Sequence, residues 1–432
     1  MPGALSGITV ADFTEYIAGP YCTMMLADMG ARVIKIEKPD GDAWRHTAPV
    51  AAYESRGFLG VNRGKESIAL DMAKPEGLAI AQRLARGADV VVVNYRPGVA
   101  KRLRLDYDSL SSGNARIVYC ENSAFGNEGP YAGRPGYDIL SQAATGMILY
   151  ENKLEKGLPT YIATLAVADL TTGMFMAFAI MNALYARLIS GNGQRIETSL
   201  FASGLAAQYR PLLSIEDVDR PVREGFLQEL DSRLKDGFHY DEIFKLRQEY
   251  IPVRGRNNYY RVYETRDGLI AVACLNNRQR RALRDVLGAN DPTVDGMGYD
   301  WFSENVRKAH QANVDMFEKA FRRRTVSEWT ESLDAADVPC ARVNFPEEVW
   351  DDPHVASNRL MLSLEHPVLG PLRMPAPPMR MSGTSPGSDR PPPALGQHGQ
   401  AILLELGYEE ADVAKLREDG VLWVREWLVD DR

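Results

Sequence analysis

One carboxylate stands at the front of the most apolar stretch of the chain. Asp169 begins a long apolar run within the segment AVADLTTGMFMAFAIMNALYARLI, residues 166–189. In the first turn of a buried helix, exposed backbone N–H groups and the helix dipole stabilise a negative charge. Such an aspartate is either a helix N-cap, the more common role on sequence grounds, or a nucleophile whose charge the helix start supports. Neighbouring residues must decide between these two interpretations.

Other common catalytic patterns are missing from the sequence. The chain has no GxGxxG, P-loop, GxSxG or HExxH motif, which lowers the odds of four common enzyme classes. Its six histidines never occur at metal-ligand spacing, and its four cysteines lie far apart with no CxxC pair,. We therefore expect no metal, no disulfide framework and no permanently bound cofactor.

Composition restricts the class of protein further. The 432 residues are 45% hydrophobic with a formal net charge of -8, which predicts two domains and argues against nucleic acid as a partner. The N-terminus does not resemble a signal peptide, so a cytoplasmic location is expected. Asn182 and Arg187 interrupt the apolar run after Asp169, so this helix is expected to be buried in the core rather than in a membrane.

The first half of the chain predicts an α/β fold. The segments GITVADF, GPYCTMMLADMG and ARVIKIEKP indicate a strand, a helix and a strand, and the pattern recurs from GKESIALDM to ARIVYCENSAFG,. The run DVVVV is typical of a strand buried on both faces. We expect a Rossmann-like large domain with a mainly parallel sheet.

A second, smaller α+β domain is expected from two strands around the Asp267-Gly268 turn and the helices that follow,. The charged stretch from about 218 to 250 suggests a linker or surface excursion. The predicted boundaries are 1–205 for the large domain, 206–224 for a linker and 225–330 for the small domain. Residues 331–432 are expected to form a linker and a C-terminal part that returns to the large domain.

Seven segments, in their order along the chain, resemble the family III CoA-transferases, the CaiB/BaiF group, which also contains the α-methylacyl-CoA racemases. These segments are GITVADFTEYIAGPYCTMMLADMGARVIKIEKPDGD, NRGKESIALDM, ADVVVVNYRPGVAKRLRLDY, SAFGNEGPYAGRPGYD, AVADLTTG, GNGQRIETSLF and HPVLGPLRMPAPP with LGQHG. Each is weak alone, but their common order is specific to the family. The resemblance implies CoA and acyl-CoA as substrates, a small carboxylic acid as partner, and an interlocked homodimer.

By this resemblance, Asp169 matches the family's catalytic aspartate. The implied reaction passes through an acyl-aspartyl anhydride and an aspartyl-CoA thioester, and the backbone N–H of Ile17 is the candidate oxyanion donor. Similar positions place Tyr137 and Asp138 beside the active site. Glu15, like Ile17, replaces a family residue near the thioester, which points to a different acyl pocket.

The resemblance also implies a set of CoA-binding residues. Basic side chains suit the phosphates, and a tyrosine can lie against adenine. The positions implied are Lys38, Asn94, Tyr95, Arg102 and Arg134. Arg96, Lys101 and Arg104 are interpreted as solvated surface charges, with a phosphate patch as the alternative for Arg104.

Two departures from the family bear on the reaction. Tyr137 stands where the racemases have a histidine, and Asn276 stands approximately where they have a glutamate, so 1,1-proton transfer is disfavoured. The segment EYIPVRGRNNYYRVYE lacks the glycine-rich loop of formyl-CoA transferase, which makes oxalate and formyl-CoA doubtful substrates. Arg254 and Arg256 in this segment either face an acceptor carboxylate or belong to a surface loop. We predict a CoA-transferase, with a racemase or epimerase and a non-catalytic CoA-binding protein as alternatives.

Overall fold

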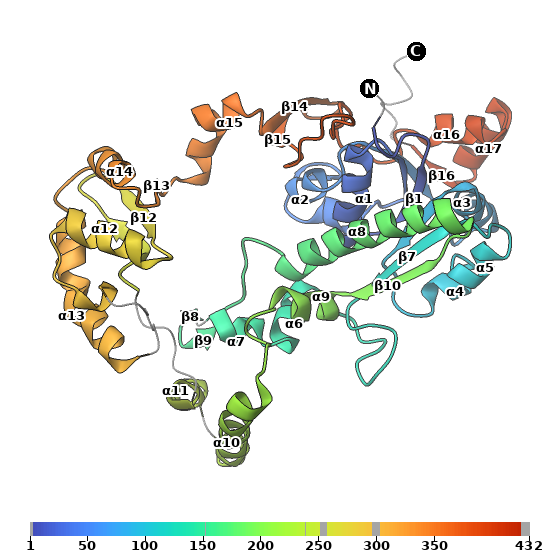
Figure 1. The fold of residues 1–432 in the computed structure, drawn as a ribbon. Helices are drawn as coiled ribbons and strands as arrows, with labels where there is room; N and C mark the ends of the chain where they lie inside the picture. The colour runs from blue at the N-terminus through green and yellow to red at the C-terminus, as the bar shows by residue number, and fades with distance from the viewer. Residues whose placement is uncertain (1–2, 152, 238, 251–256, 296–302, 425–432) are drawn as a thin grey trace. The chain divides into compact units, whose positions relative to one another are not determined.

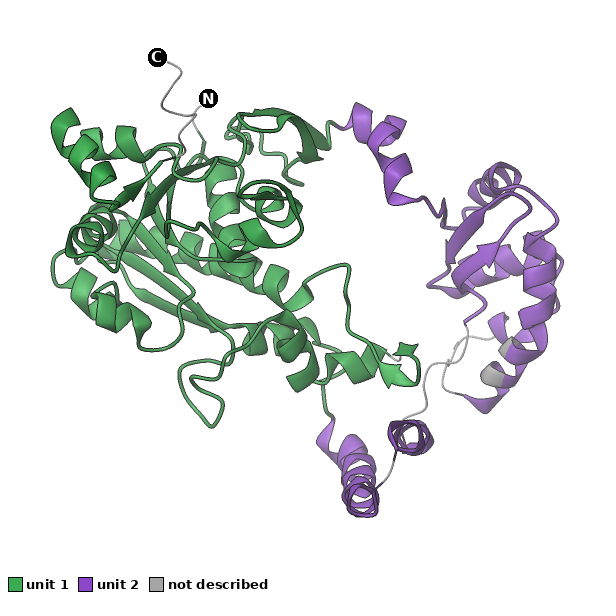
Figure 2. Cartoon of the chain, turned by 180° about the vertical axis from the view of Figure 1, so that it is seen from behind, with its two compact units in different colours: residues 1–214, 359–432 green, residues 215–358 purple. Residues whose placement is uncertain are grey.

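The computed structural model describes residues 3–151, 153–237, 239–250, 257–295 and 303–424 (Figure 1). The chain divides into two compact units (Figure 2). Unit 1 consists of residues 1–214 and 359–432, and unit 2 consists of residues 215–358.

Unit 1 is built on a seven-stranded sheet with the order β10-β7-β6-β1-β2-β5-β16. Adjacent strands are parallel, except that β16 is antiparallel to β5. The expected α/β class with a mainly parallel sheet is confirmed. The strands are β1 Thr9–Phe13, β2 Arg32–Glu37, β5 Lys65–Leu70, β6 Val90–Val93, β7 Val118–Ser123, β10 Arg195–Ser199 and β16 Leu422–Trp423.

Helices cover both faces of this sheet, because successive side chains of a strand point to opposite faces. In β6, Val91 and Val93 pack with α3, α5, α16 and α17, whereas Val90 and Val92 pack with α1 and α8. All four valines are at most 2% exposed, so the prediction of a strand buried on both faces is confirmed. The main helices are α1 Ala18–Asp28, α3 Pro75–Gly87, α5 Tyr107–Ser111, α8 Val167–Ser190, α16 Gly399–Glu405 and α17 Glu410–Glu418.

Shorter elements of unit 1 connect and flank these layers. They are η1 Ala43–His46, β3 Pro49–Ala51, β4 Glu54–Ser55, α2 Arg56–Gly60, α4 Val99–Leu103, α6 Asp138–Ala144, α7 Met147–Glu151, β8 Leu154–Glu155, β9 Leu158–Pro159, α9 Leu200–Ala207, β14 Met361–His366 and β15 Gly370–Pro375. The C-terminal segment belongs to this unit, since β16 pairs with β5 and α16 packs against the sheet.

The long helix α8 differs from its predicted full burial. Met176 and Ile180 on one face are fully buried, but Phe178, Tyr185 and Leu188 on the other are 68–78% exposed in this chain. The helix is apolar on nearly all sides, and among the described residues of unit 1 one of its faces is left largely exposed. By length and composition α8 also qualifies as a candidate membrane span, the one such helix within the described residues.

Unit 2 holds a three-stranded antiparallel sheet, in the order β11-β12-β13, packed against helices. The two strands flank the Asp267-Gly268 turn as predicted. The elements are α10 Glu216–Lys235, α11 Tyr240–Tyr250, β11 Tyr260–Glu264, β12 Leu269–Ala273, α12 Asn277–Leu287, η2 Pro292–Val294, α13 Glu304–Phe321, α14 Val326–Ala335, β13 Cys340–Arg342, η3 Pro346–Asp351 and α15 Pro353–Ser357.

The domain boundaries differ from those expected. Residues 216–235 and 240–250 form the helices α10 and α11 instead of a linker, although α10 buries none of its residues. The compact unit begins at 215 rather than 225, and it ends at 358 rather than 330. A domain boundary at residue 330 would cut through α14 and would separate β13 from its sheet partner β12.

Candidate active site

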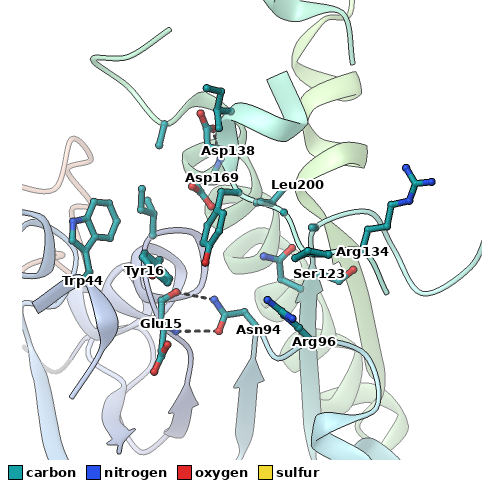
Figure 3. Close-up of a pocket in the computed structure, with 18 of the residues that line it drawn as sticks. Glu15, Tyr16, Trp44, Asn94, Arg96, Ser123, Arg134, Asp138, Asp169 and Leu200 are labelled. Atoms are coloured by element: carbon teal, nitrogen blue, oxygen red, sulfur yellow. Dashed lines mark hydrogen bonds between the residues drawn. The ribbon is translucent and has the colours of Figure 1, made fainter. Parts of the chain in front are cut away.

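A cavity of about 830 Å³ opens in unit 1 at the carboxyl ends of four adjacent strands (Figure 3). Its walls come from the segments that follow β1, β6, β7 and β10, together with the start of α8. From β1, the chain continues to β2 on one side of β1 and later forms β6 on the other side of β1. The cavity therefore lies at the switch point of the sheet, where α/β proteins commonly bind ligands.

Asp169 lines this cavity from the first turn of α8. The N-cap of α8 is Ala166, which makes no side-chain capping bond, and Asp169 is the third residue of the helix. The N-cap interpretation of Asp169 is therefore wrong. Its carboxylate accepts a hydrogen bond from the backbone N–H of Ala18 at the start of α1.

Asp138 takes the capping role instead. Its Oδ1 accepts hydrogen bonds from the backbone N–H groups of Ala168, at 2.7 Å, and Asp169, at 3.2 Å. Gln142, one turn further along α6, donates its side-chain amide to the other oxygen of Asp138. The start of α8 is thus fixed by a carboxylate about 30 residues earlier in the chain, and that carboxylate lies beside Asp169 (Figure 3).

The electrostatics of Asp169 are unusual for a residue at a helix start. Burial raises its pKa, the nearby Asp138 carboxylate raises it further, and the Ala18 N–H lowers it, with a result of about 7. Desolvation and the neighbouring carboxylate therefore raise the pKa more than the Ala18 N–H lowers it,. Asp169 is a much more basic carboxylate than an ordinary aspartate.

A glycine permits the contact between α1 and α8. A Cβ at Gly173, one turn beyond Asp169, would lie 2.7 Å from the carbonyl oxygen of Ala18 and 3.1 Å from the Tyr21 ring. No larger residue fits there without separating the two helices. The approach of α1 brings the N–H of Ala18 to the Asp169 carboxylate.

The loop from β1 to α1 forms a second wall of the site. Glu15 is fixed by Asn94, whose side-chain amide accepts from the Glu15 N–H at 3.0 Å and donates to the Glu15 carbonyl at 2.7 Å (Figure 3). Tyr16 has a left-handed backbone with φ 66°, and Ile17 is the N-cap of α1. Glu15, Tyr16 and Ile17 all line the cavity.

The CoA-binding residues implied by the resemblance divide into two groups. Asn94, Tyr95 and Arg134 line the cavity, and the Arg134 guanidinium stacks 4.5 Å from the centre of the Tyr131 ring. Lys38 is outside the lining but forms an ion pair with Glu15 at 3.2 Å. Arg102 is exposed on α4 and does not line this cavity.

Tyr137 lines the cavity beside Asp138 and packs edge-on against Tyr16, with ring centroids 5.4 Å apart. Burial raises the pKa of Tyr16 to about 12, and a hydrogen bond with Tyr137 adds to the shift. The Tyr16 hydroxyl is therefore neutral and able to donate a hydrogen bond at physiological pH,.

Many cavity residues were not identified from the sequence as site residues, among them Tyr16, Trp44 and Arg96. Arg96 is exposed, as a solvated charge would be, but it lines the cavity next to Asn94 and Tyr95. The sequence signal that could have identified Arg96 is its position directly after Asn94 and Tyr95, two of the implied CoA-binding residues. Trp44 lies two residues after Asp42 in KPDGDAWR, and the centroid of its ring lies 6.2 Å from that of the Tyr16 ring.

Other candidates lie elsewhere. Arg254 and Arg256 fall outside the described residues. Asn276 is the N-cap of α12 in unit 2, where its side chain accepts from the N–H of Gln279 at 2.9 Å. Within the described ranges, no group of three or more His, Cys, Asp or Glu side chains is arranged to hold a metal ion.

Comparisons with known proteins agree on one family. A family model for CoA-transferase family III matches residues 5–399. A human protein named succinyl-CoA:glutarate CoA-transferase is 30% identical, covering 97% of this chain and 90% of its own. An acetyl-CoA:oxalate CoA-transferase of Acetobacter aceti is 32% identical, covering 95% and 97%.

A solved structure of a CAIB/BAIF family protein from Brucella suis superimposes with a TM-score of 0.72 at 28% identity, covering 94% of this chain and all of that one. The residues matched by the family model include every segment that lines the cavity. The chain belongs to CoA-transferase family III and is an enzyme of the CoA-transferase class.

Proposed function

We propose that this enzyme moves CoA from an acyl-CoA to a free carboxylic acid through covalent intermediates on Asp169. The observation that carries the proposal is the setting of Asp169. Its carboxylate lies in a cavity of about 830 Å³, in contact with the first N–H of α1 and beside Asp138. A carboxylate in this setting is accessible to a thioester and is partly shielded from bulk water.

The chemistry proceeds in balanced steps. An Asp169 oxygen attacks the thioester carbon, so that a C–O bond forms, the C–S bond breaks and CoA leaves as a thiolate. The thiolate then attacks Cγ of Asp169, which gives an aspartyl-CoA thioester and releases the donor acid. The acceptor carboxylate repeats the two steps in reverse and restores Asp169. No net proton transfer is required.

The raised basicity of Asp169 assists the first step. A carboxylate whose pKa is about 7 is closer in basicity to a leaving thiolate than an ordinary aspartate is, since the pKa of an unperturbed cysteine thiol is about 8.5. The anhydride that it forms is therefore less disfavoured than one formed by an aspartate with a pKa near 4. The backbone N–H of Ile17, at the cavity wall, is the proposed donor to the oxyanion that develops,.

Two arginines give the cavity an affinity for anions. Arg96 and Arg134 line it, and the other cavity wall carries Trp44 and Tyr16 (Figure 3). We assign the arginines to phosphates of CoA or to a carboxylate of the acceptor. The similar proteins named above act on succinyl-CoA with glutarate and on acetyl-CoA with oxalate, so dicarboxylic acids are the first acceptors to test.

We also propose a homodimer located in the cytoplasm. The homodimer is supported by the exposed apolar side of α8 and the segment after it. Phe178, Leu188 and Ile189 on α8 are 69–78% exposed, and Tyr209 and Leu213 are 71–83% exposed. An apolar surface of this kind is typical of an interface between subunits.

The test is a mass-spectrometric screen of CoA donors against mixed carboxylic acids, with Asp169→Ala as the control. Transfer that is lost in the variant supports the proposal. Exchange of the α-proton of a single acyl-CoA without CoA transfer would indicate a racemase instead. A folded protein that binds CoA but catalyses neither reaction would indicate a binding protein.

A further inference from the structure

We propose that Asp42, paired with the buried Lys35, is a positioning residue that sets the β1–α1 loop so that its backbone N–H groups meet the reacting atoms at Asp169. This inference rests on the proposed function, which supplies the reaction that the loop serves. Asp42 is outside the residues that line the cavity, so its action is indirect. It reaches the site through the backbone of Tyr16.

Fixed side chains hold the backbone of this loop at successive positions. Thr14 donates its N–H to Asp12 at 3.0 Å, and its carbonyl accepts from Lys35 Nζ at 2.6 Å. Asn94 holds both polar backbone groups of Glu15. Asp12, Thr14 and Lys35 are at most 1% exposed, so these contacts do not compete with bulk water.

Asp42 supplies the next contact along the loop. Its Oδ1 accepts the N–H of Tyr16 at 3.1 Å and the N–H of Trp44 at 2.9 Å. Its Oδ2 lies 3.0 Å from Lys35 Nζ, and both side chains of this ion pair are fully buried. One carboxylate therefore fixes two residues of the cavity wall, and the lysine that neutralises it also holds Thr14.

The contact at Tyr16 opposes a conformational preference. Tyr16 adopts φ 66°, and the left-handed region is unfavourable for an L-residue with a bulky side chain. A buried hydrogen bond to a charged acceptor helps to offset this cost. Loss of the Asp42 carboxylate would therefore allow Tyr16 to relax toward a common backbone conformation, which would move the residues that follow it.

Those following residues carry the donors of the site. Ala18 donates its N–H to the Asp169 carboxylate. The N–H of Ile17 has no acceptor within the part of the chain that the structure describes, although Ile17 lines the cavity. A change at Tyr16 alters the direction of both groups, which would weaken oxyanion binding more than it would weaken CoA binding.

A buried ion pair elsewhere in the chain provides a matched control. Asp28, at the far end of α1, is 3% exposed and is bonded to Arg63 at 2.6 Å and 2.9 Å. Asp28→Ala removes a buried, ion-paired carboxylate from α1, the helix that follows the β1–α1 loop. It changes no residue of the loop itself. It separates a general loss of stability from a loss of positioning.

The first test compares Asp42→Ala, Asp42→Asn and Asp28→Ala in steady-state CoA transfer, with rates corrected for the folded fraction. Asp42→Ala is expected to lower kcat by about 10- to 100-fold, because oxyanion donors are worth this much or more. The KM for the acyl-CoA should change less than about threefold. Asp42→Asn keeps an acceptor oxygen for Tyr16 and should restore most of kcat, and Asp28→Ala should leave kcat unchanged. Equal losses in the three variants would overturn the proposal.

A second test uses Tyr16→Gly, because glycine adopts positive φ without strain. If Asp42 acts through the backbone of Tyr16, then Asp42→Ala costs less in the Tyr16→Gly background than in the wild-type background. Coupling of at least about fivefold in kcat is expected. Additive effects of the two substitutions would contradict the proposed route.

Hydrogen exchange provides a measurement that does not depend on activity. In Asp42→Ala, the peptide containing residues 14–18 should exchange at least about tenfold faster, whereas Asp42→Asn and Asp28→Ala should preserve its protection. Unchanged exchange in Asp42→Ala would refute the positioning role even if the enzyme transfers CoA. If the wild-type protein transfers no CoA, the proposed function fails, and the exchange result still decides how the loop is held.

Discussion

The two sides of the cavity differ in how their polar groups are held. Around Asp169, the groups are fixed by buried partners: Asp138 bonds to the first turn of α8, and Asp42 bonds to the loop before α1. On the other side, Arg96 and Arg134 are exposed, and neither forms an ion pair within the described residues. The fixed side suits a reaction, which requires preorganised donors, and the exposed side suits recognition of an anion that differs between donor and acceptor.

This difference separates two kinds of kinetic effect. Substitutions on the fixed side should change kcat, because they alter groups that act mainly in the transition state. Substitutions on the exposed side should change KM, because they alter ground-state and transition-state binding equally.

The largest effect is expected for Asp169→Ala. Because the variant lacks the nucleophile, kcat should fall by at least about 10³-fold, whereas the affinity for CoA, measured by calorimetry, should change less than about threefold. Asp169→Asn provides a control with nearly the same shape. A variant that keeps more than a tenth of the wild-type kcat would contradict the assigned role of Asp169.

Asp138→Ala should have the second largest effect. It removes the acceptor of two N–H groups at the start of α8, so kcat should fall by about 10- to 100-fold with a small change in KM. Asp138→Asn retains an acceptor and should keep more of kcat. Stopped-flow release of CoA from an acyl-CoA measures the first step directly. Equal kcat values for Asp138→Ala and the wild type would show that the cap is not needed.

A smaller effect, confined to KM, is expected on the exposed side. Arg96→Ala combined with Arg134→Ala should raise the KM of the acyl-CoA or of the acceptor acid by about tenfold, and kcat should stay within about threefold. Arg102→Ala is the matched control, since Arg102 is an exposed arginine that does not line the cavity. If Arg102→Ala raises KM more than the double substitution does, the assignment of the anion-binding side is wrong.

The pH dependence of kcat/KM should report the pKa of Asp169 in the free enzyme. Only the ionised carboxylate attacks, and its pKa is raised to about 7 by burial and by Asp138. Activity should therefore fall tenfold per pH unit below about pH 7. In Asp138→Asn, which lacks the neighbouring negative charge, this acidic limb should move to lower pH. An acidic limb near pH 4 in the wild type would contradict the assigned basicity.

The smallest effect is expected on stability. A carboxyl whose pKa is raised on folding stabilises the fold when it is protonated, and this contribution is lost as the pH rises toward about 7,. Asp169→Asn should therefore raise the Tm above pH 7 by about 2 °C or more. The difference should disappear near pH 4, where the wild-type group is neutral in the folded state. A thermal melt at each pH measures it, and a lower Tm for the variant at pH 8 would contradict the prediction.

Local patterns in the sequence predicted the strands and the position of Asp169. The run Val90–Val93 predicts a doubly buried strand, because a short continuous run of β-branched residues is typical of a strand covered on both faces,. The charged composition of residues 218–250 favours a linker or surface excursion and does not predict the two helices found there. Neither helix buries enough apolar surface to give a clear periodicity.

Contacts between distant segments could not be predicted. Asp138 caps α8 from about 30 residues away, and the N–H of Tyr16, whose backbone is left-handed, donates to Asp42, 26 residues later. Such pairings depend on how the segments pack in three dimensions, so they cannot be inferred from composition or from the spacing of motifs. The raised pKa of Asp169 also follows from packing, since a helix start alone would have lowered it.

The most direct test of the central claim is capture of the covalent intermediate. The enzyme is incubated with an acyl-CoA donor found in the screen and with hydroxylamine, and its peptides are then mapped by mass spectrometry. A hydroxamate on Asp169 and release of CoA are expected, because hydroxylamine attacks the activated Cγ carbonyl of the anhydride or thioester. Turnover with no modification of Asp169, or with modification of another carboxylate instead, would contradict the account.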